Sequence, residues 1–253
     1  MSKYDKILGL IPARYASSRF PGKPLADIGG KPMIQRVYEQ AKNVLPTVSV
    51  ATDDERIRAA VEAFGGEVVM TSDKHKSGTD RCAEALDVVE NQLNTKFDAV
   101  LNIQGDEPFI EPEQIRTLAD MFDRNEVEIA TLVKKAECKA DVFNPNKPKV
   151  VVANDGKALY FSRQVIPYLR GVDESEWTEK HEFYNHIGLY GYRADVLRRL
   201  TKLPQGILER AESLEQLRWL ENGFAIYVSR TELESLSVDT PDDLEELRRR
   251  GLI

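Results

Sequence analysis

The apolar positions in the first half of the chain follow two alternating patterns. Short, nearly continuous apolar runs predict buried strands at 7–11, 47–51, 67–70 and 99–103. Between these runs, apolar residues recur at helical spacing and predict helices at 33–44, 57–64, 78–93 and 112–122. Strands that alternate with helices indicate βαβ units, which build a parallel sheet. We therefore expect an α/β fold with a mostly parallel sheet.

The pattern changes in the second half of the chain. Strands are predicted at 128–133, 149–153, 158–162, 186–192 and 225–229, and helices at 194–200, 214–220 and 241–250. Asn154-Asp155-Gly156 predicts a hairpin turn, and the charged stretch from Arg170 to Phe183 is expected to be irregular. We interpret about 135–192 as a mixed, β-rich insertion in a single domain that spans 1–253. Such an insertion is suited to capping a site or to forming a dimer.

Length, composition and charge limit the class of protein. A chain of 253 residues that is 42% hydrophobic suits one large α/β domain, and its net charge of −7 disfavours nucleic-acid binding. The two cysteines, Cys82 and Cys138, indicate neither a metal cluster nor a disulfide framework. No apolar run reaches the ~18 residues of a membrane-spanning helix, and the first residues lack the apolar segment of a signal peptide. We expect a cytoplasmic protein that does not bind membranes.

A cationic loop follows the first predicted strand. Residues 11–25 contain Arg14, Arg19 and Lys23 among several small residues. The carboxyl ends of strands in open α/β sheets are where ligands bind, so this loop predicts a polyphosphate site. It is not a Walker A motif, because Pro24 stands where that motif has Ser or Thr and its first glycine is absent. The alternative is a solvated basic loop with a Pro-Gly turn.

Two acidic positions are candidates for a magnesium site. Asp106 follows the apolar strand at 99–103, and Asp239 precedes the last predicted helix. Mg²⁺ is commonly held by one or two carboxylates together with substrate phosphates. The alternatives are an acidic turn at Asp106 and a helix cap at Asp239 or Thr240, with Pro241 at the first helical position. The sequence does not show whether the two carboxylates meet.

Other polar segments give weaker signals. Ser77-Gly78-Thr79-Asp80-Arg81 opens a helix, where amide donors and Arg81 are suited to a base or a phosphate, although such helix starts are common. The stretch from His181 to His186 is not a zinc motif, because residues five apart diverge by ~140° on a helix. His75 is interpreted as a solvated loop residue. By themselves, Glu215 and Gln216 fit the solvent face of an amphipathic helix.

Taken together, these motifs resemble the 3-deoxy-manno-octulosonate (Kdo) cytidylyltransferase family over nearly the whole chain. The resemblance rests on the segments 11–25, 77–81, 102–108, 143–146, 158–163, 186–193, 214–218 and 238–241. Asp80 stands where many relatives carry Glu, and 171–182 falls in a variable region. The resemblance implies a Rossmann-like, GT-A-like nucleotidyltransferase fold. It also implies that CTP and Kdo are the substrates, that CMP-Kdo for lipopolysaccharide synthesis and pyrophosphate are the products, and that the enzyme is a Mg²⁺-dependent homodimer.

The resemblance also assigns roles to individual residues. The nucleotide-binding residues it implies are Ala13, Arg14, Ser17, Arg19, Lys23, Ser77, Arg81 and Gln104. The implied catalytic residues are Arg14, Lys23, Asp106 and Asp239, of which Asp106 and Asp239 bind the metal. The implied sugar-binding residues are Gln104, Arg163, His186, Tyr190, Glu215 and Gln216. Arg163 would pair with the Kdo carboxylate, because a guanidinium matches a carboxylate bidentately.

Three other functions remain open at this stage. One is a synthetase for a different CMP-sugar acid, such as sialic acid. Another is a glycosyltransferase that uses a ready-made sugar nucleotide, which should show an Asp-x-Asp motif; Asp53-Asp54 lacks that spacing. The third is a nucleotide-binding regulator without catalytic activity.

Overall fold

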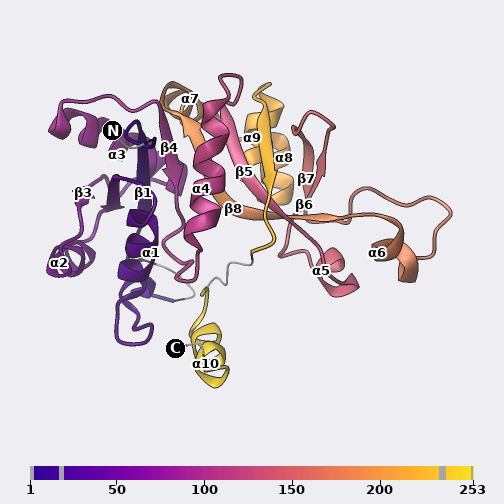
Figure 1. The fold of residues 1–253 in the computed structure, drawn as a ribbon, viewed down its shortest axis with the longest axis horizontal. Coiled ribbons are helices and arrows are strands. Elements are labelled where there is room, and N and C mark those ends of the chain that lie inside the picture. Colours follow the sequence, from indigo (N-terminus) through magenta and orange to yellow (C-terminus); the bar gives the residue numbers. More distant parts are fainter. Residues whose placement is uncertain (1–2, 17–19, 234–237, 252) are drawn as a thin grey trace. The chain divides into compact units, whose positions relative to one another are not determined.

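The computed structural model describes residues 3–16, 20–233, 238–251 and 253 (Figure 1). The chain divides into two compact units, one of residues 1–119 with 235–253 and one of residues 120–234. The predicted insertion at about 135–192 falls inside the second unit. Its role as a cap or a dimer contact stays a prediction, as does the interpretation of the whole chain as one domain.

In its described residues, the first unit contains four parallel strands. They are β1 (Ile7–Ala13), β2 (Thr47–Thr52), β3 (Val68–Met70) and β4 (Ala99–Asn102), in the order β3-β2-β1-β4. The helices are α1 (Met33–Lys42), α2 (Glu55–Ala63), α3 (Gly78–Leu93), α4 (Pro112–Asp120) and α10 (Pro241–Arg249), with a 3-10 helix η1 (Lys23–Leu25). The predicted alternation of strands and helices is confirmed here.

The register of these strands brings their carboxyl ends together. Leu10 of β1 pairs with Asn102 of β4, and Ala13 of β1 pairs with Thr52 of β2. The residues that follow β1, β2 and β4 therefore leave the sheet at one edge. In a parallel sheet this is the edge at which ligands bind.

Side-chain caps fix where the helices of this unit begin. Ser77 accepts the Asp80 N–H (3.1 Å) at the start of α3, and Asp54 accepts the Arg56 N–H (2.9 Å) at the start of α2. Thr240 caps α10 with Pro241 at its first position, which is one of the two caps that the sequence left open. Because Thr240 is the cap, the Asp239 carboxylate is not needed at the helix start and pairs with Lys23 instead.

The second unit contains a mixed sheet. Its strands are β5 (Ile129–Lys135), β6 (Lys149–Val152), β7 (Ala158–Ser162), β8 (Tyr184–Arg193) and β9 (Ile226–Arg230). Strand β5 runs antiparallel to β8 and parallel to β9, and β6 pairs antiparallel with β7 and β8. The helices are α5 (Lys139–Phe143), α6 (Trp177–Lys180), α7 (Ala194–Leu200), α8 (Ile207–Glu212) and α9 (Glu215–Glu221), with 3-10 helices η2 (Met121–Asp123) and η3 (Glu174–Glu176).

Several short helices of this unit do not follow from the sequence pattern. The stretch from Arg170 to Phe183 was predicted to be irregular, which is wrong for η3 and α6. Helices this short display hardly more than one turn of apolar periodicity, so the pattern does not reveal them. The buried Trp177 stacks on Phe183 and Phe143 and holds α6 in place.

Within the described residues, no helix is both long enough and apolar enough to cross a bilayer.

One histidine of the second unit, His186, is partly buried on β8. The His186 ring packs edge-on against Phe161, with 5.2 Å between ring centroids, and its Nε2 lies 3.0 Å from the Thr131 hydroxyl. Burial lowers the pKa of His186 from 6.5 to about 3. The imidazole is therefore neutral at neutral pH.

This burial predicts a pH dependence of stability. Between pH 6.5 and about 3 the unfolded chain binds a proton at His186 that the folded protein does not. The free energy of unfolding therefore falls as the pH drops through this window, with a slope of up to ~1.4 kcal/mol per pH unit from this group. Urea unfolding of the wild type and of His186→Gln at pH 6.5 to 4.5 should give curves that converge at the lower pH. Parallel curves would show that the ring is not buried in this way.

Candidate active site

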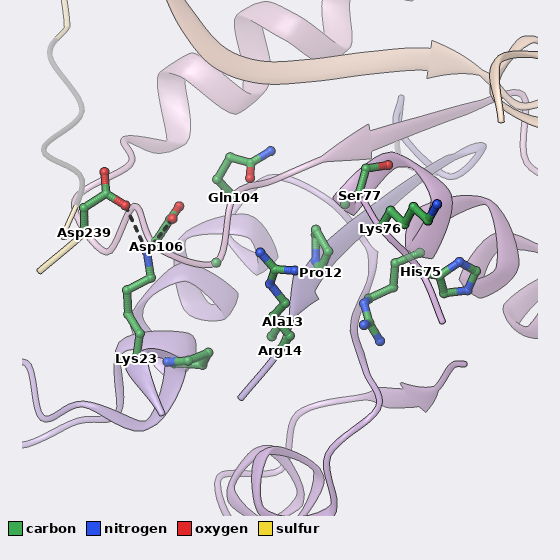
Figure 2. A pocket seen from close by; sticks show the side chains of 14 residues that line it. Pro12, Ala13, Arg14, Lys23, His75, Lys76, Ser77, Gln104, Asp106 and Asp239 are labelled. Carbon is green, nitrogen blue, oxygen red and sulfur yellow. Dashed lines mark hydrogen bonds and ion pairs between the residues drawn. The ribbon is translucent and has the colours of Figure 1, made fainter. Parts of the chain in front are cut away.

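A pocket of about 310 Å³ lies in the first unit, at the carboxyl ends of β1 and β4 (Figure 2). Its lining residues are Pro12, Ala13, Arg14, Lys23, Pro24, His75, Lys76, Ser77, Gly78, Arg81, Gln104, Gly105, Asp106 and Asp239. Among the predicted nucleotide-binding residues, Ala13, Arg14, Lys23, Ser77, Arg81 and Gln104 line this pocket. Ser17 and Arg19 lie outside the described residues.

The Lys23 ammonium joins the two predicted metal ligands. Its Nζ lies 2.7 Å from Asp106 Oδ2 and 3.2 Å from Asp239 Oδ1, and Figure 2 shows both carboxylates directed at it. The Val238 N–H donates to the Asp106 carbonyl (3.0 Å), which ties the segment before α10 to the end of β4. The carboxylates of Asp106 and Asp239 thus meet at one cation although they are far apart in sequence.

This geometry fits a magnesium ion that is shared with a substrate. Two carboxylates that converge on one cation supply the hard oxygen ligands Mg²⁺ prefers, and substrate phosphates commonly complete such sites. Among the described residues, no three His, Cys, Asp or Glu side chains form a group able to hold a metal. A site at Asp106 and Asp239 would therefore have two carboxylate ligands, and phosphate oxygens and water suit the remaining positions.

Two glycines allow the pocket wall to pack closely on β1. A Cβ added at Gly105 would lie 3.1 Å from the Pro12 carbonyl oxygen, and one at Gly78 would lie 3.2 Å from Pro12 Cγ. Gly78 is the first residue of α3, so the N–H groups and the positive end of that helix lie at the pocket. The wall therefore adds backbone donors to the charges of the cationic loop.

His75 is not the solvated loop residue that the sequence suggested. Its side chain is only 20% exposed, lines the pocket and contacts the Glu84 carboxylate, which also accepts the Ser72 N–H (3.0 Å). Burial alone would raise the pKa of Glu84, but the contacts with Ser72 and His75 outweigh it and lower the pKa. His75 and its neighbour Lys76 are lining residues that the sequence pattern did not assign to the site. Their position directly before the motif at Ser77 could have indicated that they line the pocket.

The predicted sugar-binding residues, apart from Gln104, lie in the second unit. Burial raises the pKa of Tyr190, whose ring lies 5.1 Å from the His186 ring and 5.2 Å from the Trp219 ring. Gln216 is 5% exposed, so the solvent-face interpretation is wrong for this residue. Glu215 accepts a hydrogen bond from the Arg218 guanidinium. The structure thus gathers His186 and Tyr190 on β8 near the first turn of α9.

Two polar atoms of this cluster lack a hydrogen-bond partner among the described residues. They are the Tyr190 hydroxyl and the Gln216 Nε2, and both are buried. A buried polar group without a partner costs roughly 1–3 kcal/mol, so such groups are uncommon away from functional sites. The two atoms are therefore candidates for contact with a polar ligand.

Arg163 has several backbone partners in this unit. Its guanidinium donates to the carbonyls of Glu212 (2.7 Å), Pro145 (3.0 Å) and Ser213 (3.3 Å). The Glu212 carboxylate in turn accepts the Arg163 N–H (2.7 Å). These contacts use three of the five N–H groups that a guanidinium carries. Its pairing with a substrate carboxylate stays a prediction.

A buried lysine near this arginine is a further polar group that the sequence pattern did not single out. Lys149 is fully buried, its Nζ donates to the Asn144 carbonyl (2.8 Å), and burial lowers its pKa. The signal was a lysine at the start of an apolar run, three residues after the motif at 143–146. The run by itself indicates only a strand.

Comparisons with known proteins match this chain over nearly its full length. The family model described as Cytidylyltransferase matches residues 8–233. A 3-deoxy-manno-octulosonate cytidylyltransferase of Parabacteroides distasonis is 60% identical over 95% of this chain and 96% of its own. An 8-amino-3,8-dideoxy-manno-octulosonate cytidylyltransferase of a Shewanella species is 48% identical over 95% of this chain and 96% of its own.

The fold agrees with these sequence matches. A CMP:2-keto-3-deoxy-manno-octonic acid synthetase, solved in complex with CTP, superposes with a TM-score of 0.87 at 45% identity and covers 98% of both chains. This likeness confirms the predicted α/β nucleotidyltransferase fold with a mostly parallel sheet. The chain belongs to the cytidylyltransferase family and, within it, to the 3-deoxy-manno-octulosonate cytidylyltransferases.

Proposed function

We propose that this chain transfers the cytidylyl group of CTP to the anomeric hydroxyl of Kdo, giving CMP-Kdo for lipopolysaccharide synthesis and pyrophosphate. The observation that carries this proposal is the convergence of Lys23, Asp106 and Asp239 at one edge of a pocket. These three residues belong to a chain that is 60% identical to a Kdo cytidylyltransferase.

The nucleotide half of the reaction uses the cations of the first unit. Both substrates are anions, so their approach requires positive charge at the reacting phosphate. Arg14 and Lys23 bind the triphosphate, and the amino end of α3 adds N–H donors. Pyrophosphate leaves as the hydroxyl of Kdo attacks the α-phosphorus. The residues act by positioning and electrostatic stabilisation, without a covalent enzyme intermediate.

Asp106 and Asp239 would hold Mg²⁺ in this reaction. The ion, when bound, orients phosphate oxygens, lowers the pKa of the attacking hydroxyl and offsets charge on the leaving group. The carboxylates keep their place because the Val238 N–H binds the Asp106 carbonyl and Thr240 caps α10. The Lys23 ammonium neutralises the charge of the two carboxylates when the nucleotide is absent, and it binds the phosphates when the nucleotide is present.

Kdo binding uses the polar side chains of the second unit, which come from β8, α9 and the residue after β7. The Thr131 hydroxyl donates to the Leu189 carbonyl (2.8 Å), so it accepts the Nε2–H of the neutral His186 ring. Nδ1 of that ring is then an acceptor for a sugar hydroxyl. Gln216 and Tyr190 offer further polar groups, and the remaining N–H groups of Arg163 suit the carboxylate of Kdo.

An 8-amino analogue of Kdo is the second candidate substrate. The Shewanella relative is named for that sugar and is 48% identical to this chain.

The proposal also includes the metal, the oligomeric state and the compartment. The enzyme is a Mg²⁺-dependent homodimer in the cytoplasm, with the segment at about 135–192 as the dimer contact.

The substrate assignment predicts a specific pattern of turnover. With Mg²⁺, CTP and Kdo should release pyrophosphate at least ~10-fold faster than ATP or GTP with Kdo, and faster than CTP with 8-amino-Kdo or sialic acid. A coupled pyrophosphate assay over a matrix of nucleotides and sugar acids measures this. Faster turnover of sialic acid would refute the proposed function, and faster turnover of 8-amino-Kdo would select the second candidate.

Removing the Lys23 ammonium should slow the reaction strongly. Lys23→Met keeps the length of the side chain but removes the cation at the phosphates, and one such group is typically worth ~10²–10³ in rate. The matched control is Lys31→Met, because Lys31 pairs with Glu39 on the surface outside the pocket. We expect kcat/KM to fall by about that factor in the first variant only. Near-normal turnover by a folded Lys23→Met protein would exclude the phosphate role.

The two carboxylates should act as one unit. Asp106→Asn and Asp239→Asn each keep the side-chain size but lose the charge that Mg²⁺ needs, so each should lose most of its turnover. The double variant should be little worse than the poorer single variant, because residues that act together are not additive. Asp242→Asn, on the exposed first turn of α10, is the control. Wild-type activity of Asp239→Asn at limiting Mg²⁺ would leave Asp239 without a metal role.

A further inference from the structure

Arg81 is a buried cation with two fixed partners at the pocket wall. It lies in the first turn of α3 and lines the pocket, yet its side chain is only 5% exposed. One terminal nitrogen, Nη2, lies 2.9 Å from Asp53 Oδ1, and the other, Nη1, donates to Thr71 Oγ1 (2.6 Å). The proposed chemistry at the phosphates uses neither Asp53 nor Thr71.

The sheet itself holds these two partners in place. Asp53 follows the last residue of β2 and Thr71 follows the last residue of β3, and the register pairs Thr52 with Met70. The Thr71 N–H donates to the Thr52 carbonyl (2.8 Å), and its hydroxyl donates to the same oxygen (3.2 Å). With its proton used there, the hydroxyl presents a lone pair to Arg81.

These contacts determine where the guanidinium can lie. The Thr71 hydroxyl accepts a hydrogen bond from one terminal nitrogen, and the Asp53 carboxylate lies at ion-pair distance from the other, so the orientation of the group is restricted at both ends. Because Arg81 is buried, its charge needs compensation, and only Asp53 gives it a carboxylate partner among the ion pairs of the described residues. The Nε–H and one N–H on each terminal nitrogen stay outside these two contacts. The fixed group therefore presents donors at the pocket at little entropic cost on binding.

We propose that Asp53 and Thr71 are positioning residues for nucleotide binding, which hold the Arg81 guanidinium so that its remaining N–H groups donate to oxygen atoms of CTP. This inference rests on the proposed function, because it takes CTP as the ligand of the pocket. Neither residue touches the nucleotide in this proposal, and both act through Arg81. The alternative is that the ion pair of Arg81 with Asp53 only stabilises the fold.

Substrate-specific kinetics distinguish these two roles. Asp53→Asn keeps the shape of the side chain and loses the charge, and Thr71→Val keeps the shape and loses the acceptor. We expect the KM for CTP to rise about 10-fold in Asp53→Asn and several-fold in Thr71→Val, with the KM for Kdo and kcat within about 2-fold of wild type. Thr71→Ser, which keeps the hydroxyl, should restore the wild-type KM for CTP.

The neighbouring carboxylate provides a matched control. Asp54 caps α2 and pairs with Arg56, and it does not line the pocket. Asp54→Asn should lower the melting temperature while leaving the KM for CTP unchanged. Equal changes of both KM values in Asp53→Asn, or an unchanged KM for CTP in both Asp53→Asn and Thr71→Val, would overturn the proposal.

A double-mutant cycle tests whether Asp53 acts through Arg81. In an Arg81→Gln background, Asp53→Asn should raise the KM for CTP no further, because the group it positions is gone. An equal increase in both backgrounds would refute the positioning role. If Asp53→Asn does not fold, the comparison of Thr71→Val with Thr71→Ser decides.

Calorimetric titration with CTP alone separates this proposal from the proposed function. Weaker CTP binding by Asp53→Asn and Thr71→Val supports the positioning role even if the wild type fails to use Kdo. Unchanged CTP binding by these variants overturns it even if wild-type turnover is as expected.

Discussion

The ion pairs of Lys23 with Asp106 and Asp239 set the arrangement of the whole candidate site. Two carboxylates that lie this close repel each other unless a cation lies between them. The Lys23 ammonium, 13% exposed, supplies that cation at 2.7 and 3.2 Å. The contacts join η1, the end of β4 and the segment before α10, so the cationic loop and the proposed metal ligands share one place.

The parallel sheet of the first unit explains why these groups converge. β1, β2 and β4 all end at one edge, and the residues that follow them include Arg14, Asp53 and Asp106. The amino end of α3 lies at the same pocket through Gly78, which packs on Pro12. Positive and negative groups are therefore mixed at the pocket, as an enzyme needs when it binds both a polyphosphate and a metal.

Much of this arrangement could be predicted from the sequence, because long apolar patterns and strand ends carry strong signals. The apolar runs at 7–11 and 99–103 are enough to place the cationic loop and Asp106 at one edge of the sheet. The meeting of Lys23 with Asp239 could not be predicted, since these residues are 216 positions apart and no local pattern encodes a contact across that distance. The same holds for Arg81, whose partners Asp53 and Thr71 lie at the ends of other strands.

Other features could not be predicted from the sequence for different physical reasons. The short helix α6 depends on the burial of Trp177 against Phe183, which is a tertiary contact. The burial of Gln216 follows from the packing of α9, whereas its sequence pattern fits a solvent face equally well. The sugar-binding roles of His186, Tyr190 and Gln216 remain predictions. Those of Tyr190 and Gln216 are supported by buried polar atoms that have no partner among the described residues.

A crystal structure of this protein with CTP and Mg²⁺ tests the central claim most directly. We expect the metal to contact both Asp106 and Asp239 and the Lys23 ammonium to contact a phosphate oxygen. A metal bound away from Asp239, with Lys23 still joining the two carboxylates, would contradict the shared cation site.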